Sequence, residues 1–133
     1  MRNIPAGVFL IFLSLLSDGT MNDIKNVCVY SASSTKIDQS YFDAADRLGE
    51  VLAERGINLI NGAGCLGLMR AVSDAALRAG GTVTGVIPHF MVEQGWHHKG
   101  LTRLIETETM HERKQLMADM SDGIIALPGG CGT

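Results

Sequence analysis

The sequence has few cysteines, no strongly basic region and no hydrophobic run long enough to cross a membrane. Its three cysteines, Cys28, Cys65 and Cys131, are an odd number without a CxxC pair or a zinc-like spacing to the four histidines. This pattern indicates free thiols in a reducing compartment, so we expect a cytoplasmic protein. The formal net charge of -3 argues against a broad nucleic-acid-binding face, and we expect neither DNA nor RNA as a partner.

The apolar run at residues 5–16 has the length of a signal-peptide core but is too short to span a bilayer. No A-x-A cleavage pattern follows it, and Met21 opens a polar segment before the first predicted strand. We therefore expect residues 1–20 to be an extension outside the domain rather than an export signal, and we expect no membrane partner. Residues 21–133 are then expected to form one domain.

From residue 26 onward, short β-rich runs alternate with stretches of helical period, as in βαβ units. The pattern predicts an open α/β domain with a mainly parallel sheet. The predicted strands are 27–30, 57–60, 82–87 (broken by Pro88), 104–105 and 123–127. The predicted helices are 38–55, 66–79, a short helix within 89–100, and 110–120.

A glycine-rich segment, Gly62-Ala-Gly-Cys-Leu-Gly67, is a literal GxGxxG between a predicted strand and a helix. In a dinucleotide site, an acidic residue at the end of the next strand would bind the ribose, but that strand ends in Gly85-Val-Ile-Pro88. The other interpretation is structural, with glycines that allow a tight turn and close helix packing. The missing acid favours this second interpretation.

The serine-rich turn at residues 31–34 follows the first predicted strand. Ligands of open α/β sheets bind at the carboxyl ends of strands, so the hydroxyls of Ser31 and Ser33 could contact a base or ribose. The turn could equally cap the next helix. Both interpretations stay open at this point.

Arg113 occupies an unusual position in the last predicted helix. The S/T-x-x-E spacing of Thr109 and Glu112 predicts a capping box at the start of this helix. Arg113 falls on the apolar stripe that includes Met110 and Met117, so a permanent cation is placed on or beside the face that should be buried. A buried guanidinium needs a carboxylate or a bound anion as partner, unless its side chain extends to the rim.

The last predicted strand leads into a second glycine-rich segment, which follows Pro128. Gly129, Gly130 and Gly132 allow backbone N–H groups to converge on a phosphate, and Thr133 adds a hydroxyl. Together with Arg113 they could hold a phosphomonoester from two sides. Cys131 lies in the same segment, but no His or Asp is placed to activate it as a nucleophile.

Four segments in this order, GLMRAVSDAAL, GVIPHF, MHERKQLM and SDGIIALPGGCGT, resemble the LONELY GUY (LOG) family. These proteins are cytokinin-activating phosphoribohydrolases that were once mislabelled as lysine decarboxylases. The resemblance covers residues 26–133 and implies a Rossmann-like domain with helices on both faces of the sheet. It implies hydrolysis of the N-glycosidic bond of a nucleoside 5′-monophosphate such as AMP, without metal or dinucleotide cofactor, by a homodimer.

The resemblance places the family's catalytic arginine on Arg113 and a substrate-binding lysine on Lys114. It places the phosphate loop on Gly129, Gly130, Gly132 and Thr133. The family's catalytic glutamate lies in PGGxGTxxE, just beyond Thr133, so the sequence matches a C-terminally truncated domain. We expect the 133-residue chain to be poorly stable and inactive by itself.

Two departures from the family pattern affect the expected base and ribose site. Ala32 stands where the family often has glycine, and Asn61-Gly-Ala-Gly64 stands where it often has YGGG. The neighbouring His97 and His98 have no third ligand in sequence, so we expect no metal site. A non-catalytic nucleotide-binding module on the same fold is the alternative function, because fold alone does not determine activity.

Overall fold

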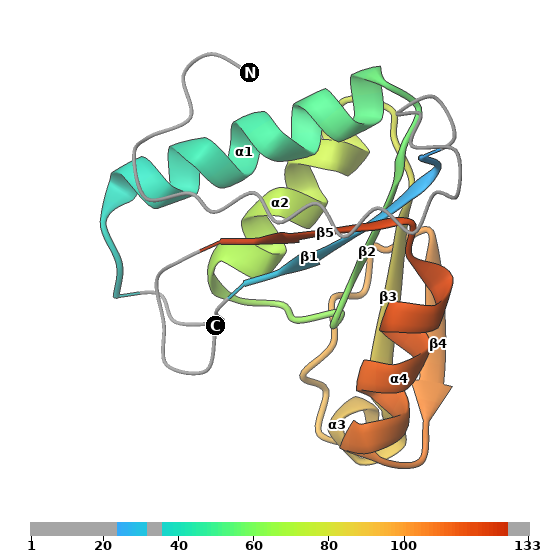
Figure 1. Ribbon diagram of the computed structural model, residues 1–133. Coiled ribbons are helices and arrows are strands. Elements are labelled where there is room, and N and C mark those ends of the chain that lie inside the picture. Colours follow the sequence, from blue (N-terminus) through green and yellow to red (C-terminus); the bar gives the residue numbers. More distant parts are fainter. Residues whose placement is uncertain (1–23, 32–35, 128–133) are drawn as a thin grey trace.

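The computed structural model describes residues 24–31 and 36–127 of the chain. Within these residues, five parallel strands form one sheet in the order β4-β3-β2-β1-β5 (Figure 1). The strands are β1 (Asn26–Tyr30), β2 (Asn58–Asn61), β3 (Val83–Pro88), β4 (Arg103–Thr107) and β5 (Gly123–Ala126). The helices are α1 (Gln39–Glu54), α2 (Gly67–Arg78), α3 (His89–Glu93) and α4 (Met110–Met120). The α/β fold class predicted from the sequence is confirmed.

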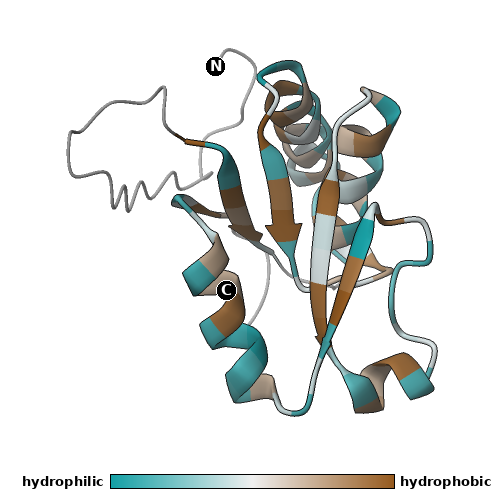
Figure 2. Ribbon diagram, turned by 90° about the vertical axis from the view of Figure 1, so that its right-hand side faces the viewer, coloured by the Kyte–Doolittle hydropathy of each residue, from teal (hydrophilic) through white to brown (hydrophobic). Residues whose placement is uncertain are grey.

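Helices cover both faces of the sheet. Helices α1 and α2 pack together on one face, and α4 lies on the other (Figure 1). Strand β1 serves both layers because successive side chains of a strand point to opposite faces. Val27 and Val29 belong to the apolar cluster beneath α1 and α2, whereas Cys28 packs with Met117 of α4. The interior strands are accordingly apolar over most of their length (Figure 2).

Strand β1 stands where the direction of the connections reverses. The chain runs from β1 to β2, β3 and β4 on one side, and β5 then returns to the other side of β1. In open parallel sheets, ligands bind at this switch point, outside the carboxyl ends of the strands. Tyr30 and Ala126 end these two strands side by side, so the segments after them start at one edge of the sheet.

The ends of β3, α3 and β4 differ from the predicted ones. Pro88 does not break the third strand but is its last residue, in register with Thr107 of β4. The pairing of β3 with β2 ends at Gly85, so Pro88 has a partner strand on the β4 side alone, as in an edge strand, where proline is tolerated. β4 is longer than predicted, and α3 covers only the first part of the predicted 89–100 segment. None of the described helices is both long enough and apolar enough to span a bilayer.

Candidate functional site

Helix α4 carries the two positively charged residues that the sequence places in a site, Arg113 and Lys114. The Thr109 hydroxyl caps the helix by accepting from the Glu112 N–H at 3.1 Å. The Glu112 carboxylate accepts from the Glu108 N–H at 3.0 Å, one residue earlier than in a standard capping box. Glu112 is therefore engaged at the start of the helix, which fixes the first turn from which Arg113 projects.

The Arg113 guanidinium binds main-chain carbonyl groups. Its Nε–H donates to the Val86 carbonyl of β3 at 2.9 Å, and an Nη2–H donates to the Gly62 carbonyl just after β2. Of the two partners predicted from the sequence, the carboxylate is replaced by these carbonyl groups among the described residues, and a bound anion stays a prediction. Carbonyl oxygens satisfy the N–H groups but carry no net charge, and within residues 24–31 and 36–127 no carboxylate forms an ion pair with Arg113. Burial lowers its pKa, yet arginine stays charged at physiological pH.

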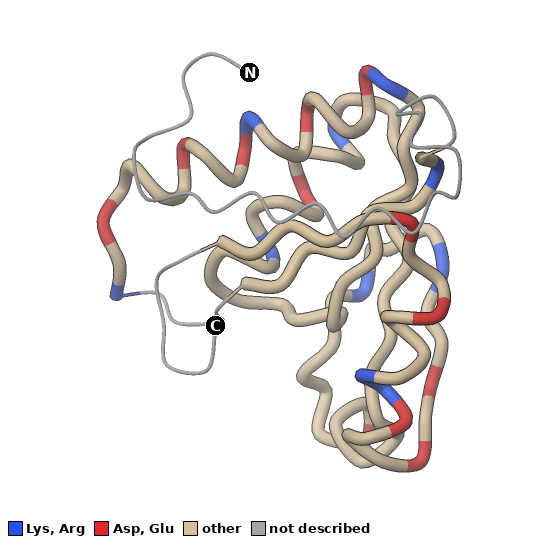
Figure 3. The backbone as a smooth tube through the Cα atoms, viewed as in Figure 1, with Lys and Arg blue, Asp and Glu red and all other residues tan. Residues whose placement is uncertain are grey.

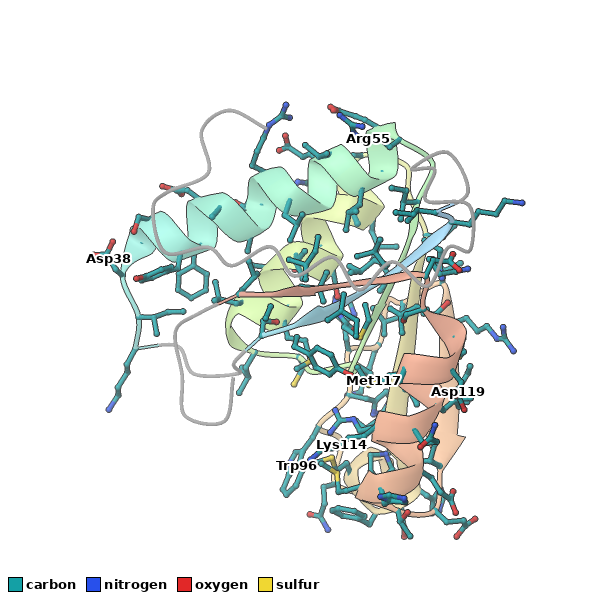
Figure 4. All side chains as sticks on the ribbon, in the orientation of Figure 1. Asp38, Arg55, Trp96, Lys114, Met117 and Asp119 are labelled. Atoms are coloured by element: carbon teal, nitrogen blue, oxygen red, sulfur yellow. The ribbon has the colours of Figure 1, made fainter. Side chains whose placement is uncertain are left out.

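Two hollows meet at Arg113. The smaller one, of about 140 Å³, is lined by Tyr30, Ser31 and Lys114 together with Arg113. The larger one, of about 340 Å³, is mainly apolar and includes Trp96 in its lining. Gly62, Met69 and Arg113 line both hollows, and in both of them the lining around the guanidinium is mainly apolar. Figure 4 shows the labelled Lys114 and Trp96 side chains at the same end of the domain, below the sheet.

Ser31 directly follows β1 and lines the smaller hollow. Its hydroxyl oxygen is shielded from solvent and has no hydrogen-bond partner among the described residues. A buried hydroxyl is normally paired, by protein, water or ligand. The position at the switch point fits the ligand-contact interpretation of the serine turn, while Ser33 lies outside the described residues.

The structure brings three of the predicted site residues together, Ser31, Arg113 and Lys114. The predicted phosphate loop, Gly129, Gly130, Gly132 and Thr133, lies outside the described residues, as does Cys131. The segment from Gly62 joins the site through a backbone carbonyl, not through the amides that a dinucleotide fingerprint would use. An added Cβ at Gly62 would lie 2.9 Å from Arg113 Cζ, so glycine here makes room for the guanidinium.

The 95–100 loop is held by His98. Its Nε2 contacts Asp74 Oδ1 of α2 at 2.6 Å, and its Nδ1 accepts from the Gly100 N–H at 2.9 Å. Both ring nitrogens are thus engaged in fixing the loop. In the described part of the chain, no three His, Cys, Asp or Glu side chains are grouped to bind a metal ion.

Charges of both signs are interspersed over the described surface (Figure 3). Helix α1 is mainly acidic with a single arginine, α4 carries both signs, and the picture shows no continuous basic stripe in this view. The cations at the site are therefore a local feature of the sheet's carboxyl edge.

The chain is similar in sequence to one family of known proteins. The family described as "possible lysine decarboxylase" matches residues 69–133. The cytokinin riboside 5′-monophosphate phosphoribohydrolase LOG5 of Arabidopsis thaliana is 44% identical over 82% of this chain and 48% of its own length. The cytokinin riboside 5′-monophosphate phosphoribohydrolase of Rhodococcoides fascians is 40% identical over 82% of this chain and 56% of its own length. The resemblance to the LOG family is confirmed.

The chain spans about half the length of these LOG relatives. Solved structures also share the fold of the LOG-type domain. The molybdenum cofactor carrier protein of Chlamydomonas reinhardtii superimposes with a TM-score of 0.69 at 25% identity, covering 82% of this chain and 65% of that one. The molybdenum cofactor binding protein of Rippkaea orientalis gives a TM-score of 0.71 at 23% identity, covering 85% and 67%.

Proposed function

We propose that this chain supplies the substrate-binding half of a phosphoribohydrolase. The reaction is hydrolysis of the N-glycosidic bond of AMP or a cytokinin riboside 5′-monophosphate to the free base and ribose 5-phosphate. The observation that carries the proposal is Arg113, a half-buried cation with no ion-pair partner among the described residues, at the edge where parallel sheets bind ligands. Relatives at 40–44% identity carry the name of this activity.

In the proposed reaction, the cations bind the phosphate and a carboxylate stabilises the charge on the ribose. Arg113 and Lys114 would neutralise and orient the 5′-phosphate, together with the amides of the predicted loop at Gly129, Gly130 and Gly132. Cleavage of the bond from the anomeric carbon to the base develops positive charge on the ribose, which a carboxylate would stabilise while it directs water. The family resemblance places that carboxylate beyond Thr133. We therefore propose that the 133-residue chain binds nucleotide but does not turn it over.

A homodimer is part of this proposal. Four large apolar side chains, Leu66, Phe90, Trp96 and Met110, are exposed by 39–53%, and two of them line the larger hollow. Apolar residues exposed in a group around a site are typical of contact surfaces. A second subunit packed against these four side chains would cover them and close the larger hollow. We place the protein in the cytoplasm because its cysteine pattern suits a reducing environment.

The test uses two proteins, the chain itself and a chimera in which Thr133 is followed by the C-terminal remainder of the Rhodococcoides fascians enzyme. Each is incubated with AMP or N6-isopentenyladenosine 5′-monophosphate, and base release is followed by chromatography. We expect release by the chimera, and its loss in Arg113→Ala. Arg103→Ala is the matched control, since Arg103 is an exposed arginine of the edge strand β4. Equal activity of both variants would contradict the role of Arg113.

The second candidate is a nucleotide-binding module without catalysis. It is favoured by the shared fold of solved proteins that are named as molybdenum cofactor carrier and binding proteins. Calorimetric titration of both proteins with AMP separates the two candidates. Binding without base release by the chimera supports the module, and base release supports the enzyme.

A further inference from the structure

We propose that Asn61 is a positioning residue for Arg113. Asn61 is the last residue of β2 and is fully buried. It does not contact the guanidinium. It fixes the orientation of the 62–63 peptide group, whose carbonyl is one of the two that accept from the guanidinium. The catalytic consequence of this inference rests on the proposed function, whereas the placement of Arg113 can be measured without it.

The Asn61 side chain joins the loop after β2 to helix α2. Its Oδ1 accepts from the Ala63 N–H at 2.9 Å. Its Nδ2 donates to the Ser73 hydroxyl at 2.7 Å. Ser73 lies in the middle of α2 and is 1% exposed. The amide is thus tied to a rigid helix on one side and to the loop backbone on the other.

The two ends of one peptide group link Asn61 to Arg113. The Ala63 N–H and the Gly62 carbonyl belong to the same peptide unit, which is planar and trans, so they point in opposite directions. Asn61 Oδ1 accepts from the N–H, and the carbonyl accepts from Arg113 Nη2. Because the plane is rigid, holding the N–H also aims the carbonyl at the guanidinium.

The loop conformation itself requires such a restraint. Ala63 has φ of 61°, in the left-handed region that residues with a Cβ disfavour. It is fully buried, and its carbonyl accepts from the His98 N–H at 2.8 Å. Without the Asn61 bond, the 62–63 peptide has one fewer contact to hold it in this orientation. We therefore expect the Gly62 carbonyl to turn and Arg113 to lose one of its two carbonyl partners.

Asn58 is a matched control at the opposite end of the same strand. Its amide bonds to Asn26 Oδ1 at 3.1 Å, to Thr84 Oγ1 at 3.2 Å and to the Thr82 hydroxyl at 2.8 Å. It is an asparagine with at least as many hydrogen bonds as Asn61, but far from Arg113 along β2. Ser73→Ala is an intermediate variant, because it removes the helix-side bond that anchors Asn61 and leaves the bond to Ala63 in place.

The test compares Asn61→Leu, Asn58→Leu and Ser73→Ala by two measurements. The first is the Arg113 Nε–H signal in nitrogen-15 NMR spectra of the 133-residue chain, assigned by its loss in Arg113→Lys. The second is kcat for base release by the chimera. We expect Asn61→Leu to move the signal and to lower kcat about tenfold or more, as loss of a hydrogen bond to a charged group would. The Asn58→Leu control should lower thermal stability while leaving the signal and kcat near wild type, and Ser73→Ala should change both in the same direction as Asn61→Leu but by less.

The outcomes separate the two proposals. If the wild-type chimera releases no base, the proposed function fails, and the NMR comparison alone decides the role of Asn61. If Asn61→Leu leaves the Arg113 signal in place, or if Asn58→Leu moves it equally, Asn61 has only a structural role and the inference is wrong. Should Asn61→Leu not fold, Asn61→Ala takes its place with the same expected direction, since alanine has no side-chain atom that can accept from the Ala63 N–H.

Discussion

Replacing Gly62 by alanine is expected to displace the Arg113 guanidinium while leaving the backbone of the loop in place. Gly62 does not have a positive φ, so alanine can adopt its backbone conformation. The added Cβ would lie 2.9 Å from Arg113 Cζ and 3.3 Å from Nε, and its three nearest neighbours are all guanidinium atoms of Arg113. The guanidinium is the free end of a flexible side chain, so it moves more easily than the strands on either side.

The magnitude follows from the contacts that are lost. A hydrogen bond to a charged group contributes about 1.5–3 kcal/mol, and the bond to the Gly62 carbonyl is of this kind. Alanine restricts the unfolded chain more than glycine does, which offsets about 0.4–1 kcal/mol. The free energy of unfolding should therefore fall by about 0.5–2.5 kcal/mol. For a domain of this size, that lowers Tm by roughly 2–10 °C.

A double-mutant cycle tests whether the effect acts through Arg113. Thermal unfolding is measured for the wild type, Gly62→Ala, Arg113→Ala and the double variant, all in the 133-residue chain. With Arg113 already truncated, the Cβ of residue 62 has room, and Gly62→Ala should cost almost nothing. The reasoning is refuted if Gly62→Ala is as destabilising in the Arg113→Ala background as in the wild type. Base release by the chimera should fall about tenfold or more in Gly62→Ala.

Two further predictions concern the β1 region. Asp122 Oδ2 accepts from the backbone N–H groups of Lys25 and Asn26 at 2.9 Å each, so Asp122→Ala should lower the free energy of unfolding by about 1–3 kcal/mol in denaturant titrations; an unchanged midpoint would contradict this. Burial raises the pKa of the Cys28 thiol to about 11. The folded state keeps the thiol protonated while the unfolded state ionises near pH 9, so stability present below that pH should be lost between about pH 9 and 11. Cys28→Ala should flatten this part of the pH profile, and alkylation at pH 8 should label Cys65 before Cys28, a buried residue.

Much of the fold could be predicted because its causes are local. Apolar residues at strand and helix periods indicate β1 to β5, α1 and α2, and glycines and capping residues mark their ends. Helix α4 has a weaker apolar face, with Met117 as its one buried residue, and its start is marked by the capping residue Thr109. The stripe on α4 that includes Met117 placed Arg113 near the buried face, which the structure confirms as a half-buried position. The segments around Arg113 and the final glycine-rich run were enough to identify the LOG resemblance that the relatives confirm.

The partners of Arg113 could not be predicted in the same way. The Val86 and Gly62 carbonyls are 27 and 51 residues away in sequence, and every residue of the chain carries such a carbonyl. A pattern of side chains therefore does not indicate which two carbonyl groups accept from the guanidinium. The same holds for Asn61, whose side chain is informative only once α2 brings Ser73 beside it.

What the sequence determines by itself is therefore the order of strands and helices, the cation on α4 and the family to which these motifs correspond. What only the tertiary structure decides is which backbone groups face that cation. The reason is physical: periodicity and capping are properties of neighbouring residues, whereas the parallel pairing of β2 with β3 brings the Gly62 loop and Val86 to one edge of the sheet. The sequence alone specifies the charge of Arg113, whereas the carbonyl groups of Val86 and Gly62 come together around it only when the sheet forms.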